Sequence, residues 1–250
     1  MVKALVLRTA GTNCDGETMH ALISCGADPD LLHLREILKK PKELSKYSIL
    51  AIPGGFSYGD DVAAGKILAN ELRFKLKGEL EQFVREKKLV LGICNGFQVL
   101  VKTGLLPGSE SFDFVQDSTL TQNDSGRFQC EWVGIRKEKS KAGWLRTLPQ
   151  TFDLPIAHGE GKFVAKDSRG LKHIEKNGQV VFRYHPGNPN GSANSIAGVC
   201  NSMGNVVGLM PHPERYVSIY QHPAWTRTEQ KGKTPGLLFW EGAVQYARNL

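Results

Sequence analysis

The sequence predicts an α/β fold with a mostly parallel sheet and helices on both faces. In the first half of the chain, aliphatic runs of strand length alternate with segments of helical spacing, as in a doubly wound sheet. The run 89–93 is apolar throughout, as expected for a strand that is buried on both faces. With 250 residues the chain can bury a sizeable core, and we expect one domain over 1–250.

The first half should hold most of the parallel sheet. Its expected elements are strands at 2–7, 30–34 and 48–52, a helix that ends at Gly26, a short helix or loop at 36–44 broken by Pro41, and a long helical segment at 62–88. The spacing of Met19, Leu22 and Ile23 predicts the buried face of the first helix. We expect the long segment to break near Gly78.

The second half predicts an antiparallel or mixed addition to this sheet. Short strands are expected at 128–135, 152–157, 162–165, 180–184, 195–199 and 206–209. The pair Asn177-Gly178 is a hairpin signal, and 203–205 should form the turn of another hairpin. Thr234 as N-cap and Pro235 at the first helical position predict a last helix that runs to Leu250.

The composition excludes several classes of protein. No apolar run is long enough to span a membrane and no secretory leader is visible, so a soluble, cytoplasmic protein is expected. The five cysteines are odd in number and lack a Cys-x-x-Cys pair, so neither a disulfide framework nor a metal site is expected.

The net charge of +7 does not by itself indicate nucleic-acid binding. The lysines are spread through several segments without interleaved aromatic residues or a known binding motif, which favours solvated faces. An acidic protein partner, or a phosphate on a distant substrate, stays open on electrostatic grounds.

Cys94 is the first candidate for chemistry. It lies where the strand 89–93 gives way to a helical pattern, between Gly92 and Gly96. Such a strand-to-helix corner is typical of nucleophile elbows, and a helix N-terminus beside the sulfur favours the reactive thiolate. The alternative is a buried core cysteine next to a tight turn.

Gly54 and Gly55 end the third expected strand, at the same sheet edge as Cys94. Two glycines let a backbone N–H approach a ligand closely, which suits one half of an oxyanion hole. A plain strand-ending turn is the alternative.

His212 and Glu214 are the second chemical signal. They lie in Pro-His-Pro-Glu-Arg at 211–215, and in an extended segment their side chains would share a face. The carboxylate would fix the imidazole tautomer and leave the other ring nitrogen to take a proton from a thiol. A polar surface turn is the alternative.

Together these motifs resemble the class I (triad) glutamine amidotransferases. The cysteine motif Gly-Ile-Cys-Asn-Gly-Phe-Gln at 92–98 and Pro-His-Pro-Glu at 211–214 carry this likeness. The stretches 53–60, 64–65, 123–128, 158–161 and 211–215 are similar, in order, to the amidotransferase subunits of phosphoribosylformylglycinamidine synthases, which act in purine synthesis. The resemblance implies a single-domain, flavodoxin-like fold.

The resemblance also implies roles for individual residues. Cys94 would attack the side-chain amide of glutamine, His212 would act as base and then acid, and Glu214 would orient His212. A γ-glutamyl thioester would form and be hydrolysed to glutamate. The amides of Gly55 and Asn95 would form the oxyanion hole. Candidates for holding the glutamine are Gln98, His158 and Gly159, of which Gln98 could be a polar helix residue and His158 a structural histidine.

The family passes its ammonia to an ATP-dependent synthetase on a separate chain. The stretch ending in Gly232-Lys233-Thr234 looks like the end of a P-loop, but Arg227 occupies the position of its first glycine. The resemblance therefore implies no cofactor in this chain, with ATP and Mg²⁺ used by a synthetase partner, and probably a small bridging subunit besides. A free-standing glutaminase is the alternative.

Three other functions compete with this interpretation. The chain could supply ammonia to a different synthetase, although the 54–60 loop speaks against it. It could also be a non-catalytic regulatory or redox-sensing protein with a cysteine elbow, against which the intact Cys94, His212 and Glu214 set argues. A nucleic-acid binder is the most distant alternative.

Overall fold

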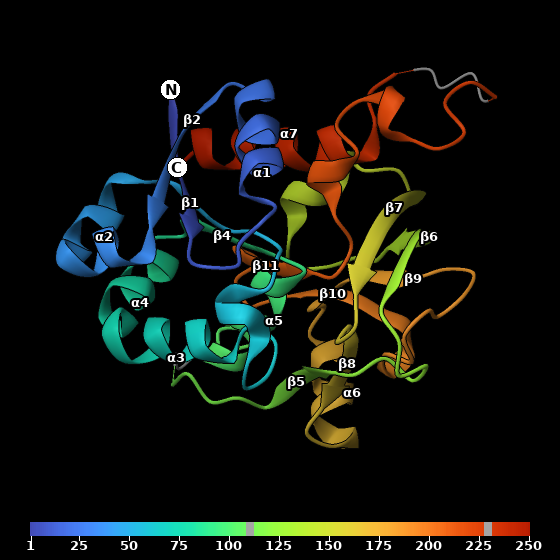
Figure 1. Cartoon of the computed structure of the whole chain (residues 1–250), viewed down its shortest axis with the longest axis horizontal. Coiled ribbons are helices and arrows are strands. Elements are labelled where there is room, and N and C mark those ends of the chain that lie inside the picture. Colours follow the sequence, from blue (N-terminus) through green and yellow to red (C-terminus); the bar gives the residue numbers. More distant parts are fainter. Residues whose placement is uncertain (109–112, 228–231) are drawn as a thin grey trace.

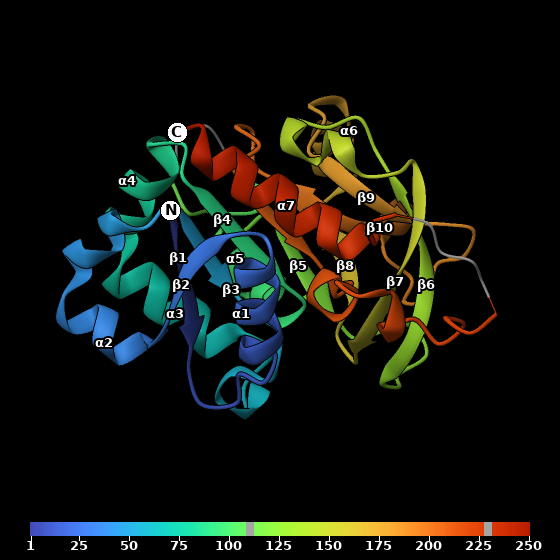
Figure 2. The same ribbon diagram turned by 90° about the horizontal axis from the view of Figure 1, so that it is seen from above.

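The chain was analysed as a computed structural model, which describes residues 1–108, 113–227 and 232–250. A nine-stranded sheet runs through the whole molecule, with helices packed on both of its faces (Figures 1 and 2). Its strands follow one another in the order β2-β1-β3-β4-β11-β10-β9-β6-β7. The predicted α/β fold with a mostly parallel part and an added antiparallel part is confirmed.

The parallel half of the sheet comes from the first 93 residues together with one late strand. Its strands are β2 (Ala27–His33), β1 (Val2–Arg8), β3 (Ile49–Ile52), β4 (Leu89–Ile93) and β11 (Val206–Leu209). Each is parallel to its neighbour, with registers such as Leu5 beside Leu50 and Leu91 beside Val207. β2 contains Pro29, which is tolerated because β2 is an edge strand.

The antiparallel half extends the sheet beyond β11. Its strands are β10 (Ile196–Cys200), β9 (Val180–Tyr184), β6 (Gln129–Lys137) and β7 (Thr151–His158). Each strand is antiparallel to its neighbours, and β10 and β11 form the predicted hairpin. A separate two-stranded ribbon pairs β5 (Ser118–Thr121) with β8 (Lys162–Ala165).

Seven helices of the described residues surround the sheet. They are α1 (Asp15–Ser24), α2 (Leu34–Lys39), α3 (Lys66–Lys75), α4 (Lys77–Arg85), α5 (Asn95–Thr103), α6 (Ser168–Lys176) and α7 (Pro235–Arg248). α1 and α7 lie on one face of the parallel strands, and α3, α4 and α5 lie on the other (Figures 1 and 2). None of these helices is both long and apolar enough to cross a membrane.

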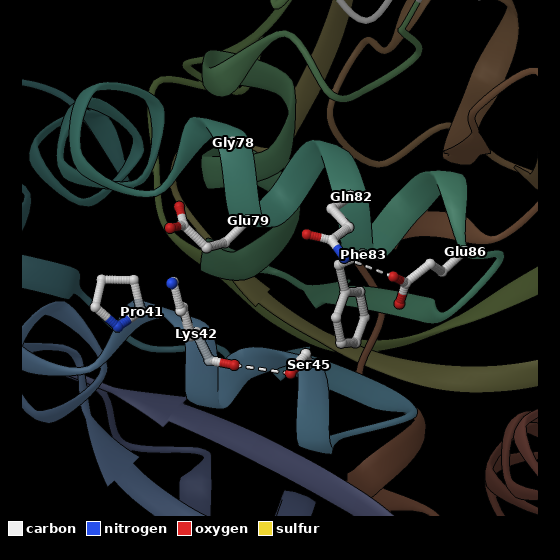
Figure 3. A pocket seen from close by; sticks show the side chains of 8 residues that line it. All are labelled: Pro41, Lys42, Ser45, Gly78, Glu79, Gln82, Phe83 and Glu86. Carbon is white, nitrogen blue, oxygen red and sulfur yellow. Dashed lines mark hydrogen bonds between the residues drawn. The ribbon is translucent and has the colours of Figure 1, made fainter.

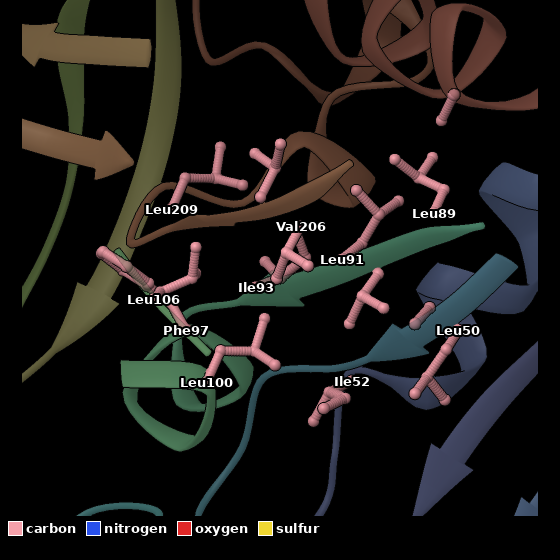
Figure 4. Close-up of a cluster of buried hydrophobic side chains, with 14 of the residues drawn as sticks. Leu50, Ile52, Leu89, Leu91, Ile93, Phe97, Leu100, Leu106, Val206 and Leu209 are labelled. Carbon is pink, nitrogen blue, oxygen red and sulfur yellow. The ribbon is translucent and has the colours of Figure 1, made fainter. Parts of the chain in front are cut away.

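The core extends on both faces of the sheet and includes residues of α5, α1 and α7, and Figure 4 shows its part around β4, β11 and α5. Gly92 and Gly96 allow α5 to approach closely, because a Cβ on Gly96 would lie 1.9 Å from the Ile52 carbonyl oxygen. The contact is thus built from glycines where strand and helix meet and from large aliphatic side chains elsewhere. Fully buried examples are Leu50, Ile52, Leu89, Leu91, Ile93, Phe97, Leu100, Leu106, Val206 and Leu209.

Two details of the predicted helices are wrong. Ile23 is 57% exposed, because α1 buries Thr18, Ala21 and Leu22 instead and ends one residue after Ile23. The long segment breaks near Gly78 as expected, at Leu76, which leaves the helical conformation and packs into the core. Its helix also begins at Lys66, not at Val62.

The hairpin predicted at Asn177-Gly178 is wrong as well. These residues end α6, a helix that the sequence analysis did not predict, and their amides return to carbonyls of its last turn. Gly178 has φ +65°, a conformation that suits glycine at a helix end. The helix is N-capped by Asp167, whose side chain accepts from the Gly170 amide at 2.7 Å.

Candidate active site

The candidate residues lie where neighbouring parallel strands end. Gly54 and Gly55 follow β3, Cys94 follows β4, and His212 comes three residues after β11. β3, β4 and β11 are adjacent and parallel, so their carboxyl ends meet at one edge of the sheet. This is the edge at which ligand sites of doubly wound sheets form.

Cys94 forms the sharp corner that the sequence predicts. Its backbone has φ 51° and ψ −104°, which a residue with a side chain rarely adopts. A conformation of this kind costs about 1–3 kcal/mol and is typical of functional sites. The Cys94 sulfur lies 3.6 Å from the Ala157 carbonyl oxygen on β7, so the thiol lies between β4 and β7.

His212 and Glu214 form a buried pair. The His212 Nδ1 atom and the Glu214 Oε1 atom are 2.5 Å apart, and both residues are 1% exposed. The extended backbone predicted for this segment is wrong, because Pro213–Arg215 form a short 3₁₀ helix. The turn, rather than the pleat of a strand, brings the two side chains together.

The environment of His212 favours its protonated form. Burial lowers the pKa of His212, but the Glu214 carboxylate and then Cys94 raise it by more than burial lowers it. The pKa of His212 therefore lies well above its usual value. Gly54 lies next to both His212 and Cys94. A Cβ on Gly54 would lie 2.9 Å from the His212 ring and 3.4 Å from the Cys94 Cβ. Cys94 and His212 are therefore close neighbours with no side chain between them at this position.

Two backbone amides beside Cys94 have no acceptor among the described residues. Gly55 bridges to Thr12 through the hydrogen bonds of its neighbours, which leaves its own N–H unused. Asn95 is the first residue of α5, where an amide has no partner within the helix. Free amides at a nucleophile corner are the donors that an oxyanion requires.

A cavity of about 180 Å³ opens next to the Cys94 sulfur. The three residues predicted to hold glutamine all line it, together with Cys94 and Gly55. The remaining lining residues are Phe56, Asp60, Ala64, Phe128, Ala157 and Glu160.

Gln98 and His158 make hydrogen bonds within the protein as well as lining the cavity. The Gln98 amide donates to the Glu160 carbonyl at 2.7 Å and accepts from the Asn95 side chain at 3.0 Å. The His158 Nδ1 atom lies 3.1 Å from the Asn123 side-chain oxygen, and its Nε2 atom has no partner among the described residues. Burial, and then the charge on His212, lower the pKa of His158 to about 4, so this ring is neutral at pH 7.

Sequence reasoning missed a charged cluster on the cavity wall. Glu160 accepts from the Ala64 amide at 3.4 Å and lies 3.8 Å from Lys102, which is almost fully buried. Asp60 accepts from the Gly65 amide at 3.1 Å and from the Asn95 side chain at 3.2 Å. Asp60 and Glu160 occur in the motif stretches 53–60 and 158–161, which was the available signal.

Cys14 is the second omission. Its sulfur lies 4.0 Å from the His212 Nδ1 atom and accepts a hydrogen bond from the Arg215 guanidinium at 3.0 Å. Cys14 follows β1, which ends at the same sheet edge as β3 and β4. That position was the only signal, since 198 residues separate Cys14 from His212.

A second cavity, of about 290 Å³, lies between α4 and the 3₁₀ helix Pro41–Lys46 (Figure 3). Charged and amide side chains such as Lys42, Glu79 and Gln82 line it, and none of its lining residues belongs to the candidate site.

The P-loop-like stretch falls partly on residues 228–231, which lie outside the described residues. Thr234 acts as the predicted N-cap of α7 and accepts from the Leu237 amide at 3.3 Å.

Comparisons of the sequence identify relatives over the whole chain. Residues 1–247 match the CobB/CobQ-like glutamine amidotransferase domain. The phosphoribosylformylglycinamidine synthase subunit PurQ of Dehalococcoides mccartyi is 42% identical over 256 residues, which cover 100% of this chain and 99% of that protein. The PurQ subunit of Treponema denticola is 41% identical and 98% of each chain is covered.

Solved structures agree with the sequence comparisons. The structure of PurLQS from Thermotoga maritima contains a chain with 33% identity and a TM-score of 0.76, and 99% of this chain and 98% of that chain are covered. A glutamine amidotransferase from Thermotoga maritima, with 17% identity and a TM-score of 0.57 over 99% and 96% of the two chains, shares the fold. The resemblance found in the sequence is confirmed. The chain therefore belongs to the CobB/CobQ-like glutamine amidotransferases and, within them, to the family of PurQ subunits of phosphoribosylformylglycinamidine synthase.

Proposed function

We propose that this chain, as one glutaminase domain over 1–250, hydrolyses L-glutamine and supplies the ammonia for a phosphoribosylformylglycinamidine synthase. The reaction served is the conversion of formylglycinamide ribonucleotide to formylglycinamidine ribonucleotide in purine biosynthesis. The observation that carries the proposal is the convergence of an elbow cysteine, a buried histidine–glutamate pair and two unused amides at one edge of the sheet, where Cys94 and Gly55 line a cavity. Membership of the PurQ family indicates glutamine as the substrate of this site.

Cys94 is the nucleophile in this proposal. Its sulfur attacks the side-chain amide carbon of glutamine, and the proton of the thiol passes to His212. Glu214 holds the Nδ1 proton of His212, so that the Nε2 atom is the one that exchanges protons with the thiol and the leaving group. The high pKa of His212 supports a role in which the ring carries the proton between the two steps.

The Gly55 and Asn95 amides stabilise the oxyanion of the tetrahedral intermediate. Each such donor is worth about 3–4 kcal/mol of transition-state stabilisation. When the intermediate collapses, ammonia leaves with the proton of His212 and a γ-glutamyl thioester remains on Cys94. Water then attacks the thioester, with His212 again as base, and glutamate is released.

Gln98, His158 and Gly159 hold the glutamine substrate in the cavity. Their common position on its wall supports this assignment. Because the Gln98 amide is already bonded to Glu160 and Asn95, its contribution is to fix the shape of the wall. The neutral His158 ring has a free Nε2 atom that can bond to the substrate.

The ammonia is used by a synthetase on a separate chain, with a small bridging subunit as a third component. The similarity over nearly the full length to a chain of PurLQS from Thermotoga maritima supports this assembly. ATP and Mg²⁺ act in the synthetase, and this chain needs no cofactor for the chemistry of Cys94. The complex works in the cytoplasm, where de novo purine synthesis takes place.

The proposal is tested by measuring glutamate release from glutamine with and without the synthetase, its small subunit, ATP and formylglycinamide ribonucleotide. Activity should require Cys94 and should rise when the complete mixture is present. Cys94→Ala is the inactive variant, and Cys130→Ser, at an exposed cysteine on β6, is the matched control. Equal activity of the Cys94→Ala variant, or no glutamate in any mixture, would overturn the proposal.

A further inference from the structure

Cys14 places a second buried thiol beside the proposed catalytic base. The residue is 1% exposed, at the start of α1, and its sulfur is 4.0 Å from the His212 Nδ1 atom. Nδ1 faces Glu214, so Cys14 lies on the Glu214 side of the ring. The proposed reaction uses Cys94 and leaves Cys14 without a part.

Three metal-binding atoms meet at this point. The Cys14 sulfur, a His212 ring nitrogen and a Glu214 carboxylate oxygen all lie within 4.8 Å of one another, and all three residues are buried. Sulfur, imidazole and carboxylate are the donors from which Zn²⁺ sites are built. The second carboxylate oxygen of Glu214 is buried and has no hydrogen-bond partner among the described residues, so one donor of the set is unused.

A tetrahedral zinc site would need the Nδ1–S distance to shorten by about 0.5 Å and the Nδ1–O distance to lengthen by about 0.9 Å. With Zn–N at about 2.0 Å, Zn–S at about 2.3 Å and Zn–O at about 2.1 Å, tetrahedral angles separate N from S by about 3.5 Å and N from O by about 3.4 Å. The corresponding distances here are 4.0 Å and 2.5 Å. The ion would replace the proton between His212 and Glu214, with shifts of less than about 1 Å.

We propose that Cys14, His212 and Glu214 form a binding site for one thiophilic divalent cation of the Zn²⁺ class, and that the bound ion switches off the thiol chemistry at Cys94. The site assembles from the first and the last parallel strand, which is why it has no short-spaced motif. The ion binding itself does not depend on the proposed glutaminase reaction. Only the inhibition rests on that function.

The inhibition follows because the ion and the Cys94 thiol would use the two nitrogens of the same His212 ring. A cation on Nδ1 leaves the proton of a neutral imidazole on Nε2, so that Nε2 can no longer accept the proton of the Cys94 thiol. The ion also takes the Glu214 carboxylate, which otherwise holds His212 in its working orientation. Starting from the protonated His212 ring, binding releases the Nδ1 proton and the Cys14 thiol proton to solvent, and the Nε2 proton stays on the ring.

Arg215 can remain next to the sulfur in the loaded state. Its guanidinium donates a hydrogen bond to the Cys14 sulfur at 3.0 Å. Hydrogen bonds from outer groups to metal ligands are a regular part of such sites. The positive charge of Arg215 opposes the cation and limits its affinity, which suits reversible binding.

The first experiment measures Zn²⁺ binding to the full chain by competition with a chromophoric chelator. The wild type, the Cys94→Ala variant and the Cys130→Ser control should bind one equivalent with the same affinity. The Cys14→Ser variant should bind at least about tenfold more weakly, since loss of a ligand costs no less than loss of an outer partner. Co²⁺ should give a thiolate charge-transfer absorption that persists in Cys94→Ala and is missing in Cys14→Ser.

The second experiment measures inhibition of glutamate release by Zn²⁺ in the complete mixture. The wild type and Cys130→Ser should be inhibited at the concentration at which they bind the ion, and Cys14→Ser should need at least about tenfold more. Loss of binding in Cys94→Ala would assign the ion to a Cys94–His212 pair and overturn the proposal. Unchanged binding in Cys14→Ser with native circular dichroism, or no stoichiometric binding by the wild type, would also overturn it.

Discussion

The His212 Nδ1 atom and the Glu214 Oε1 atom are 2.5 Å apart at a site where both side chains are buried. The contact fixes the tautomer of the imidazole and holds its pKa high. The other ring nitrogen, Nε2, has no partner among the described residues, and in the proposed reaction it would act on Cys94. In the proposed reaction Glu214 would orient His212, and His212 would transfer the proton.

Replacing Glu214 by Gln tests this division. The amide keeps the shape of the side chain but lacks the charge and can impose the wrong tautomer, so kcat for glutamine hydrolysis should fall by about 10²- to 10⁴-fold. The pKa of His212, followed by NMR of the ring protons, should fall as well. A variant with full kcat and an unchanged pKa would show that Glu214 has no orienting role.

Replacing Gly55 by Ala tests the oxyanion hole. The new Cβ would lie 2.6 Å from the Gly11 carbonyl oxygen and 2.7 Å from the Asn13 nitrogen, and φ at Gly55 is +140°, so the amide must move. A displaced donor should lower kcat by about 10²-fold with a smaller change in KM.

Gly78→Ala is the matched control for this substitution. Its Cβ would meet nothing within 4 Å inside α4, so activity should be kept and the free energy of unfolding should rise by about 0.5–1 kcal/mol. Equal activity of the Gly55→Ala and Gly78→Ala variants would remove Gly55 from the oxyanion hole.

The backbone of Cys94 predicts an unusual stability order for its variants. At φ 51° and ψ −104° a residue without a Cβ is less strained than one with a Cβ. Cys94→Gly should therefore be more stable than Cys94→Ala by about 1 kcal/mol, the reverse of the order expected in ordinary backbone. Urea unfolding of the two inactive variants gives the comparison, and a clearly more stable alanine variant would argue against strain at the elbow.

His158 predicts a loss of stability in mild acid. Burial lowers its pKa in the folded chain to about 4, while the unfolded chain keeps the usual value of about 6.5. Between these values the unfolded chain binds more protons, so the free energy of unfolding falls as pH falls. For this group alone the loss from pH 7 to pH 5 is about 2 kcal/mol.

The His158→Gln variant isolates this contribution. Urea unfolding at both pH values should show a smaller loss for the variant than for the wild type, by about the same 2 kcal/mol. His212, whose pKa is raised, acts in the opposite direction and is present in both proteins. Equal losses would mean that the His158 ring is not kept neutral by burial.

Much of the fold was predictable because the local signals agreed with the tertiary structure. The apolar run 89–93 and the turn at 203–205 lie where the sequence predicts them, since strand length, apolarity and turn residues all pointed the same way. α6 was missed because it is short and only Ile174 on it is buried. The Asn177-Gly178 pair at its end was then mistaken for a hairpin turn, because a glycine with positive φ is typical both of helix ends and of hairpin turns.

Groups that lie in a recognisable motif were predictable, among them Gly55 and His158 from other strands, whereas groups outside such motifs were not. Cys94 and His212 carried local signals in the glycines and prolines around them. Cys14 carried none, since its place beside His212 depends on β1 and β11 having their carboxyl ends at one sheet edge. Lys102 is buried on α5 next to Glu160, but nothing in the sequence distinguishes it from a surface lysine.

The most direct test of the account is to find where a diazoketone analogue of glutamine reacts with the chain. Mass spectrometry of the labelled protein, alone and with the synthetase, should locate the adduct on Cys94, and excess glutamine should prevent it. The Glu214→Gln variant should be labelled more slowly, and the Cys94→Ala variant should not be labelled even though Cys14 is intact. Labelling at Cys14 instead, or no labelling of the complete complex, would contradict the claim that Cys94 is a glutaminase nucleophile.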